Sequence, residues 1–231
     1  MNQVRKEIRR MWSCIEGIRL QPFIHLETGE QTGQEALSVL STGIEPDHFF
    51  RTFAPDVCLL QFFDQMDIVS QMKLTTPCFL NLPVRVLAEP ECVRRLTQIR
   101  VCYRRNIVIE VQDPAEIVIA EDRMADTVTH GVNTLRCYGW QVWLDDLTYG
   151  VCRELSKTGM QFDGVKIDRK ELASPQSLGT LVKQARKLVM SQENNLLVEG
   201  IETEEDLERA RNSGAIWGQG FLWPEKRVTF R

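Results

Sequence analysis

The sequence predicts an α/β fold, a barrel in which one strand is antiparallel to the rest. Three observations support this prediction. Five short apolar runs end in an acidic residue or an amide, helix-like stretches precede these runs, and a hairpin pattern opens the chain. Buried parallel strands are near-continuous apolar runs, and their carboxyl ends gather at one face of a barrel.

The five runs are short and rich in Val, Ile and Leu. They are Cys78-Phe79-Leu80 before Asn81, Ile107-Val108-Ile109 before Glu110, Val142-Trp143-Leu144 before Asp145-Asp146, Val165-Lys166-Ile167 before Asp168, and Leu196-Leu197-Val198 before Glu199. We expect the residues at these ends to converge on one site. Because a ring of carboxylates is unfavourable unless a cation neutralises it, the sequence favours metal ions there.

The first element expected is a hairpin within residues 20–37. Two extended segments flank Thr28-Gly29-Glu30, and Gly29 and Gly33 are turn and bulge signals. A barrel that opens on a hairpin has one strand antiparallel to the rest.

Helices are expected after Pro46 and Pro55, since proline favours the first turn of a helix. A third helix is predicted from Ser174 as N-cap and Pro175 as first residue, and a fourth from Thr203 as N-cap to Gly214. The apolar stripes of the first three helices are, in order, Phe49, Phe50 and Phe53; Leu59, Phe62, Phe63, Met66 and Val69; and Leu181, Ala185, Leu188 and Val189. The alternation of strand and helix runs the whole length without a linker or a clear repeat, so we expect one domain over residues 1–231.

Composition excludes several classes of protein. The net charge of −4 argues against a broad nucleic-acid surface. No apolar run approaches the roughly 20 residues that span a bilayer, and the basic N-terminus lacks the apolar segment of a signal peptide. Seven cysteines without a CxxC pair are typical of reduced thiols. We therefore expect a cytoplasmic protein without membrane or direct nucleic-acid binding.

Seven motifs, in order, resemble the EAL domain, the bacterial cyclic-di-GMP phosphodiesterase family. They are Gln21-Pro22 with Gly29 and Gly33-Gln34-Glu35-Ala36-Leu37; Leu80-Asn81-Leu82; Ile109-Glu110-Val111-Gln112-Asp113; Leu144-Asp145-Asp146; Lys166-Ile167-Asp168-Arg169; Val198-Glu199-Gly200-Ile201-Glu202-Thr203; and Gln219-Gly220. The resemblance covers roughly residues 19–225. It implies an α/β fold, a modified TIM-like (β/α)8 barrel with one antiparallel strand, in agreement with the barrel predicted from the residues.

The resemblance also implies a role for each matching position. Glu35, Asn81, Glu110 and Asp145 would bind one divalent ion, and Asp145 and Asp146 would help to hold a second. Lys166 would orient the attacking water, Glu199 would complete the acidic ring, and Gln219 would position water. Oxygen ligands of this kind suit Mg²⁺ or Mn²⁺, and two such ions can drive phosphodiester cleavage.

Structural alternatives exist for some of these residues. Lys166 could simply pair with Asp168, and Asn81 could cap a helix. Adjacent buried carboxylates at Asp145 and Asp146 repel without a cation, so they are harder to explain structurally. Glu202 and Asp113 are expected to support the site or its loops.

The chain departs from the family pattern in two main places. Active members usually carry an arginine that contacts ligand phosphate two positions after the EAL leucine, where this chain has Val39. Losing a charged hydrogen bond to an anion costs about 1.5–3 kcal/mol. The loop Asp145-Asp146-Leu147-Thr148-Tyr149-Gly150 replaces the first glycine of the family pattern with Thr148, which restricts the backbone. A smaller change puts Asp113 where the family has a glutamate.

Three functions follow from the resemblance. The first is a stand-alone, catalytically impaired EAL protein that represses motility by binding a protein partner, such as the flagellar master transcriptional activator. The second is an active Mg²⁺- or Mn²⁺-dependent phosphodiesterase that converts cyclic-di-GMP to linear pGpG. The third is a module that binds cyclic-di-GMP without cleaving it, a function that Val39 disfavours. The first is the leading interpretation at this stage, while the retained metal and catalytic positions support the second.

Overall fold

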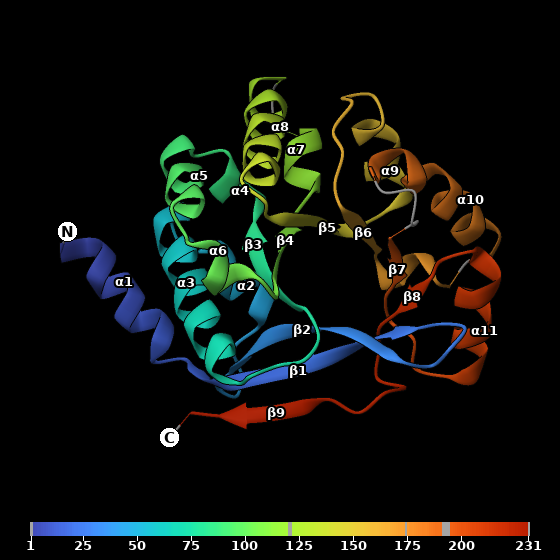
Figure 1. The fold of residues 1–231 in the computed structure, drawn as a ribbon, viewed down its shortest axis with the longest axis horizontal. Coiled ribbons are helices and arrows are strands. Elements are labelled where there is room, and N and C mark those ends of the chain that lie inside the picture. The colour runs from blue at the N-terminus through green and yellow to red at the C-terminus, as the bar shows by residue number, and fades with distance from the viewer. Residues whose placement is uncertain (1, 120–121, 174, 191–194, 231) are drawn as a thin grey trace.

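The computed structural model describes residues 2–119, 122–173, 175–190 and 195–230. Over these residues nine strands form one sheet that closes into a barrel (Figure 1). The strands are β1 (Ile15–His25), β2 (Gln31–Leu40), β3 (Cys78–Pro83), β4 (Ile107–Gln112), β5 (Gln141–Leu147), β6 (Gly164–Ile167), β7 (Leu196–Val198), β8 (Trp217–Gly218) and β9 (Lys226–Thr229).

Strand β1 closes the barrel. It pairs antiparallel with both β2 and β8, whereas successive strands from β2 to β8 pair in parallel. The predicted TIM-like barrel with one antiparallel strand is therefore confirmed, as is the hairpin whose turn contains Gly29. Strand β9 lies outside the barrel and pairs with residues 17–20 of β1, below it in Figure 1.

Helices surround the barrel on the outside (Figure 1). They are α1 (Asn2–Trp12), α2 (Pro46–Arg51), α3 (Pro55–Gln71), α4 (Val84–Leu87), α5 (Pro90–Thr97), α6 (Val101–Arg104), α7 (Ala115–Ile119), α8 (Asp122–Cys137), α9 (Tyr149–Leu155), α10 (Pro175–Ala185) and α11 (Glu204–Ser213), with short 3-10 helices at Arg169–Glu171 and Arg186–Leu188. Among the described residues, no helix has both the length and the hydropathy needed to cross a bilayer.

The local signals in the sequence account for several helix ends. Helices α2, α3 and α10 begin at the expected prolines. Thr203 forms a capping box with Asp206 at the start of α11, and Gly214 ends that helix at a φ of 84°. The expected N-cap Ser174 lies outside the described residues. The stripe that reaches Val189 is divided, because α10 ends at Ala185 and a 3-10 helix follows.

The inside of the barrel has an apolar layer and, two residues further along each parallel strand, a polar layer. Phe23, Phe79, Val108, Trp143 and Leu197 form a buried cluster with Trp217 against it. Side chains two positions apart share a face of a strand. The same alternation therefore places the following polar residues inside the barrel: Glu35, Asn81, Glu110, Asp145, Lys166, Glu199 and Gln219.

Intervening strand residues belong to a second, larger core. Leu80, Ile109, Leu144, Ile167 and Val198 are at most 1% exposed and belong to the cluster that includes the apolar faces of α3 and α10. The strands thus bury apolar side chains on their outer face and mixed ones on their inner face. Because both faces of these strands are buried, polar and apolar residues do not alternate regularly along the apolar runs.

Three of the five strands are longer than the apolar runs that predict them. β3 continues to Pro83, β4 to Gln112 and β5 to Leu147. Asn81, Glu110 and Asp145 therefore lie within strands and not after them. Only β6 and β7 end directly before the expected residues, Asp168 and Glu199.

Close packing in the apolar layer depends on Gly164. A Cβ atom at this position would lie 2.2 Å from the ring of Trp143. We expect Gly164→Ala to lower the free energy of unfolding by about 1–3 kcal/mol, because the indole cannot move without disturbing Phe79 and Trp217, which pack against it.

Urea denaturation would measure this loss. Gly179→Ala is the matched control, because a Cβ atom there meets nothing within 4 Å and alanine favours the α10 helix. Equal stability of Gly164→Ala and the wild type would show that the apolar layer is not tightly packed.

Candidate metal centre and adjoining cavity

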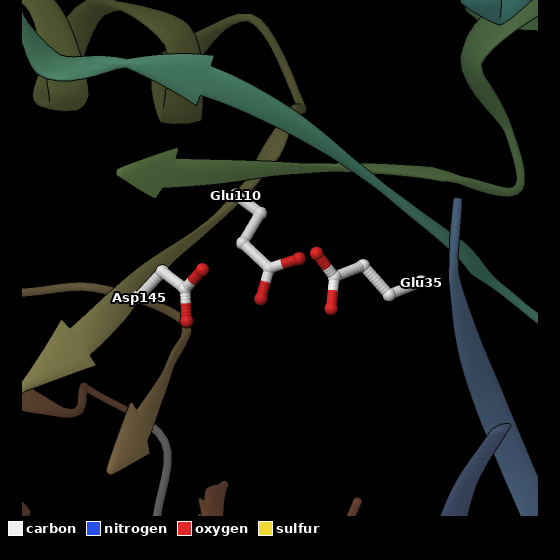
Figure 2. Close-up of side chains that lie close together, drawn as sticks. All are labelled: Glu35, Glu110 and Asp145. Carbon is white, nitrogen blue, oxygen red and sulfur yellow. The ribbon is translucent and has the colours of Figure 1, made fainter. Parts of the chain in front are cut away.

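Three carboxylates from three strands meet inside the barrel (Figure 2). Glu35 on β2, Glu110 on β4 and Asp145 on β5 each offer an oxygen, and these oxygens lie within 4.8 Å of one another. The strand register brings Glu110 and Asp145 together. Glu110 pairs with Asn81 of β3, and Val111, the next residue, pairs with Leu144, which directly precedes Asp145. All three side chains are buried.

A second triad shares Asp145 with the first. Oxygens of Asp145, Asp146 and Glu199 also lie within 4.8 Å of one another. Consecutive strand residues normally face opposite sides, but the pairing of β5 with β6 shifts register between Leu144 and Leu147. Asp146 has a φ of 52° at this irregularity. The bulge therefore lets two adjacent carboxylates reach one site.

Lys166 lies at the centre of this arrangement. Its ammonium nitrogen is 2.6 Å from Glu110 Oε1, 2.6 Å from Glu199 Oε1, 3.0 Å from Glu35 Oε2 and 3.2 Å from Asp145 Oδ1. The side chain is 1% exposed. The alternative in which Lys166 merely pairs with Asp168 is wrong, because Asp168 instead binds Lys170 and caps the 3-10 helix at Arg169–Glu171.

Amide side chains hold Glu35 in place. Asn81 Nδ2 donates to Glu35 Oε1 at 2.6 Å, and Gln219 Nε2 donates to Oε2 at 2.7 Å. Gln219 also donates to Gln21 Oε1 at 2.7 Å. Asn81 therefore does not cap a helix. Gln21 was given no role from the sequence, although its position two residues before Phe23 on β1 is a signal that it faces the interior.

The pKa values reflect the crowding of negative charge. Burial raises the pKa of Glu110 well above its usual value, and the neighbouring Glu35 adds to the rise. Burial also raises the pKa of Glu199 well above its usual value, against the opposing charge of Lys166. For Lys166, burial acts to lower the pKa, but the four carboxylates outweigh it and raise the value well above the usual range. Lys166 is therefore protonated.

Unlike those two glutamates, Glu35 has a lowered pKa. Burial acts to raise it, but the charge of Lys166 and the hydrogen bonds from Asn81 and Gln219 outweigh that effect. Asp146 has a pKa raised to about 7, first by the charge of Asp145 and then by burial. If all five carboxyls of Glu35, Glu110, Asp145, Asp146 and Glu199 were ionised, their negative charge would exceed what the one ammonium can balance.

Several buried oxygens of the site fit a hard cation. Asn81 Oδ1, Gln219 Oε1 and Glu110 Oε2 are buried and accept no hydrogen bond from the described residues, whereas Glu110 Oε1 is paired with Lys166 at 2.6 Å. Such unsatisfied acceptors cost about 1–3 kcal/mol each. An all-oxygen donor set suits Mg²⁺, Mn²⁺ or Ca²⁺. These residues could therefore hold a divalent ion.

Other residues quoted from the motifs lie outside this cluster. Asp168, expected to converge with the others, is buried but not part of either triad. The exposed Glu202 contributes only its backbone N–H, which donates to Asp206. Asp113 follows β4 and pairs with Arg51 at 2.6 Å.

A cavity of about 260 Å³ adjoins the metal centre. Asn81 and Asp146 belong to both. The remaining wall includes Ala36, Leu37 and Ser38 of β2, Phe50 of α2 and three arginines, Arg19, Arg51 and Arg85. The sequence offered no signal for these arginines, which look like ordinary surface charges. Val39 is half-buried opposite Gly17 of β1 and is not among the residues that line the cavity.

The altered loop is less constrained than expected. Thr148 has a φ of −96°, a conformation open to any residue, and its hydroxyl accepts from the Val151 N–H as the N-cap of α9. Leu147 is fully buried and pairs with Ile167. The expectation that losing a glycine restricts the backbone here is wrong, because this position needs no positive φ.

The raised pKa of Asp146 predicts an unusual pH dependence of stability in the metal-free protein. The unfolded carboxyl titrates near 3.8 and the folded one near 7. As the pH falls from 8 to 6, the folded state takes up a proton that the unfolded state does not, so the melting temperature should rise.

This rise can be measured by thermal denaturation in EDTA. Asp146→Asn should have a flatter profile than the wild type over the same range. An identical slope in the two proteins would mean that Asp146 does not titrate there.

Comparison with known proteins agrees with this architecture. The sequence model of the EAL domain family matches residues 5–225. None of the curated proteins matches the chain. Among solved structures, the EAL enzyme Bd1971 in its cAMP- and cyclic-di-GMP-bound form is 20% identical, with a TM-score of 0.70, over 98% of this chain and 65% of that chain.

Two further solved structures are similar in fold. Klebsiella pneumoniae BlrP1 in a manganese/cy-diGMP complex is 20% identical, with a TM-score of 0.72, over 93% of this chain and 56% of that one. The PaMucR phosphodiesterase in complex with c-di-GMP is 18% identical, with a TM-score of 0.70, over 92% and 96%. The chain thus spans about two thirds of Bd1971 and just over half of BlrP1. Because the family model covers all but the ends of the chain, the protein belongs to the EAL domain family.

Proposed function

We propose that this protein is a divalent-metal-dependent phosphodiesterase that opens cyclic-di-GMP to linear pGpG. One observation carries the proposal: two carboxylate triads share Asp145, and buried side-chain oxygens of the same site lack hydrogen-bond donors among the described residues. The substrate class is suggested by the cyclic-di-GMP complexes of Bd1971, BlrP1 and PaMucR.

Each residue has an assigned place in this proposal. Glu35, Asn81, Glu110 and Asp145 would bind one Mg²⁺ or Mn²⁺, and Asp145 and Asp146 a second. When bound, such a pair of ions activates water and stabilises the leaving oxygen of a phosphodiester. Oxygen ligands from four different strands are rigid enough to hold a reacting phosphate in line.

Lys166 and its partners would position these groups and would not remove a proton. A protonated lysine between four carboxylates cannot act as a base, but it keeps their oxygens at fixed distances. Glu199, which is 18% exposed, is the member of the ring best placed to accept a proton from water. Gln219 would steady Glu35 and present its unpartnered Oε1 to water.

A second candidate function is regulation by protein contact in the cytoplasm, including repression of motility through the flagellar master activator. The observation that favours it is Val39, because β2 then has no positively charged side chain to contact ligand phosphate. This function needs the folded barrel but not the metal centre, so the two candidates make opposite predictions for a metal-ligand variant.

Asp145→Asn tests the metal centre. Because Asp145 belongs to both triads, its loss should weaken Mg²⁺ or Mn²⁺ binding by about 10- to 100-fold in calorimetric titrations. The exposed Glu202 provides the control, since Glu202→Gln should bind like the wild type. Unchanged affinity of Asp145→Asn would contradict a metal role for this residue.

Glu35→Ala separates the two functions. The pure wild type incubated with cyclic-di-GMP and Mg²⁺ or Mn²⁺ should yield linear pGpG by chromatography, and the variant should be slower by about 100-fold or more, because an ion ligand is lost. A wild type without product would overturn the enzymatic proposal. In cells, a folded Glu35→Ala protein that still represses swimming would support regulation by contact instead.

A further inference from the structure

The cavity beside the metal centre has a cationic wall that no motif accounts for. Arg51 comes from α2 and Arg85 from α4, so two separate elements bring guanidinium groups to one cavity. Arg19 of β1 also lines it but is engaged by Glu225 at 2.7 Å. The cavity is therefore lined both by two residues of the metal centre, Asn81 and Asp146, and by arginines.

Asp113 marks where an anion sits between these arginines. Its Oδ1 lies 2.6 Å from Arg51 Nη2, and its Oδ2 lies 3.8 Å from Arg85 Nη1. One carboxylate thus lies between two guanidinium groups. The planar fork of arginine matches the oxygens of phosphate as well as those of carboxylate.

Arg85 is held rigidly but keeps donors for a ligand. Its Nη2 donates to the Phe50 carbonyl at 3.0 Å, which fixes the guanidinium against α2. Among the described residues, the acidic neighbours of its Nη1 are Asp113 at 3.8 Å and Glu116 at 4.0 Å, both beyond hydrogen-bond distance. Arg51 is 61% exposed, so its side chain can adjust to an incoming group.

A cyclic dinucleotide carries two phosphodiesters, and only one can react at a time. We propose that Arg51 and Arg85 form the subsite for the second, unreacting phosphodiester while the first lies at the metal centre. This inference rests on the proposed function. In this subsite, α2 and α4 supply the phosphate contact that β2 lacks because it carries Val39 in place of an arginine. The subsite makes the cavity selective for a ligand with two phosphates.

Calorimetric titration with cyclic-di-GMP tests the subsite, with Ca²⁺ present to fill the oxygen sites. Arg51→Gln should bind about 10-fold more weakly than the wild type, and Arg85→Lys should also bind more weakly, because lysine keeps the charge but loses the planar fork. Arg9→Gln, on the exposed face of α1, is the control for overall charge and should not change the affinity. Cyclic GMP has one phosphate, so Arg51→Gln should leave its binding unchanged.

Two results would overturn the subsite. One is wild-type affinity for cyclic-di-GMP in both Arg51→Gln and Arg85→Lys, and the other is an equal loss of affinity for cyclic GMP. Arg51 is largely exposed, so Arg51→Gln remains informative even if Arg85→Lys folds poorly. A wild type that binds but does not hydrolyse cyclic-di-GMP would overturn the proposed enzyme alone, whereas one that does not bind it would overturn both.

Discussion

The pairing of Lys166 with four buried carboxylates is the interaction on which the centre of this barrel depends. Without the ammonium group, the interior would hold a ring of uncompensated negative charge, which no protein core tolerates. With it, one positive charge faces Glu35, Glu110, Asp145 and Glu199, and Asp146 lies close by. The remaining negative charge is the physical reason why the site suits divalent cations.

Strand geometry decides which residues reach that centre. An apolar layer around Trp143 fills the barrel, and the next inward-facing positions form the polar layer. The bulge at Asp146 is the one departure from strict alternation in this part of β5, and it adds a second triad at the cost of an unusual backbone conformation.

Much of this arrangement could be predicted from the sequence, because strands and helix caps are local signals. The barrel, the antiparallel strand and the ends of α11 at Thr203 and Gly214 follow from periodicity, capping and turn residues. The lengths of β3 to β5 could not be predicted, since polar inward-facing residues interrupt an apolar run without ending the strand. The contact between Lys166 and Glu35 joins residues 131 positions apart in the sequence, which no local pattern contains.

The two arginines of the cavity wall show how a motif can mislead about charge. Reading Val39 alone suggests a site that has lost its attraction for phosphate. In the folded chain, Arg51 of α2 and Arg85 of α4 line the cavity, and Asp113 lies between them. Carboxylates that suit cations and arginines that suit an anion are complementary parts of the proposed phosphodiester site. The charge that a ligand meets is therefore a property of the assembled cavity, and a single substituted motif position is weak evidence that catalysis has been lost.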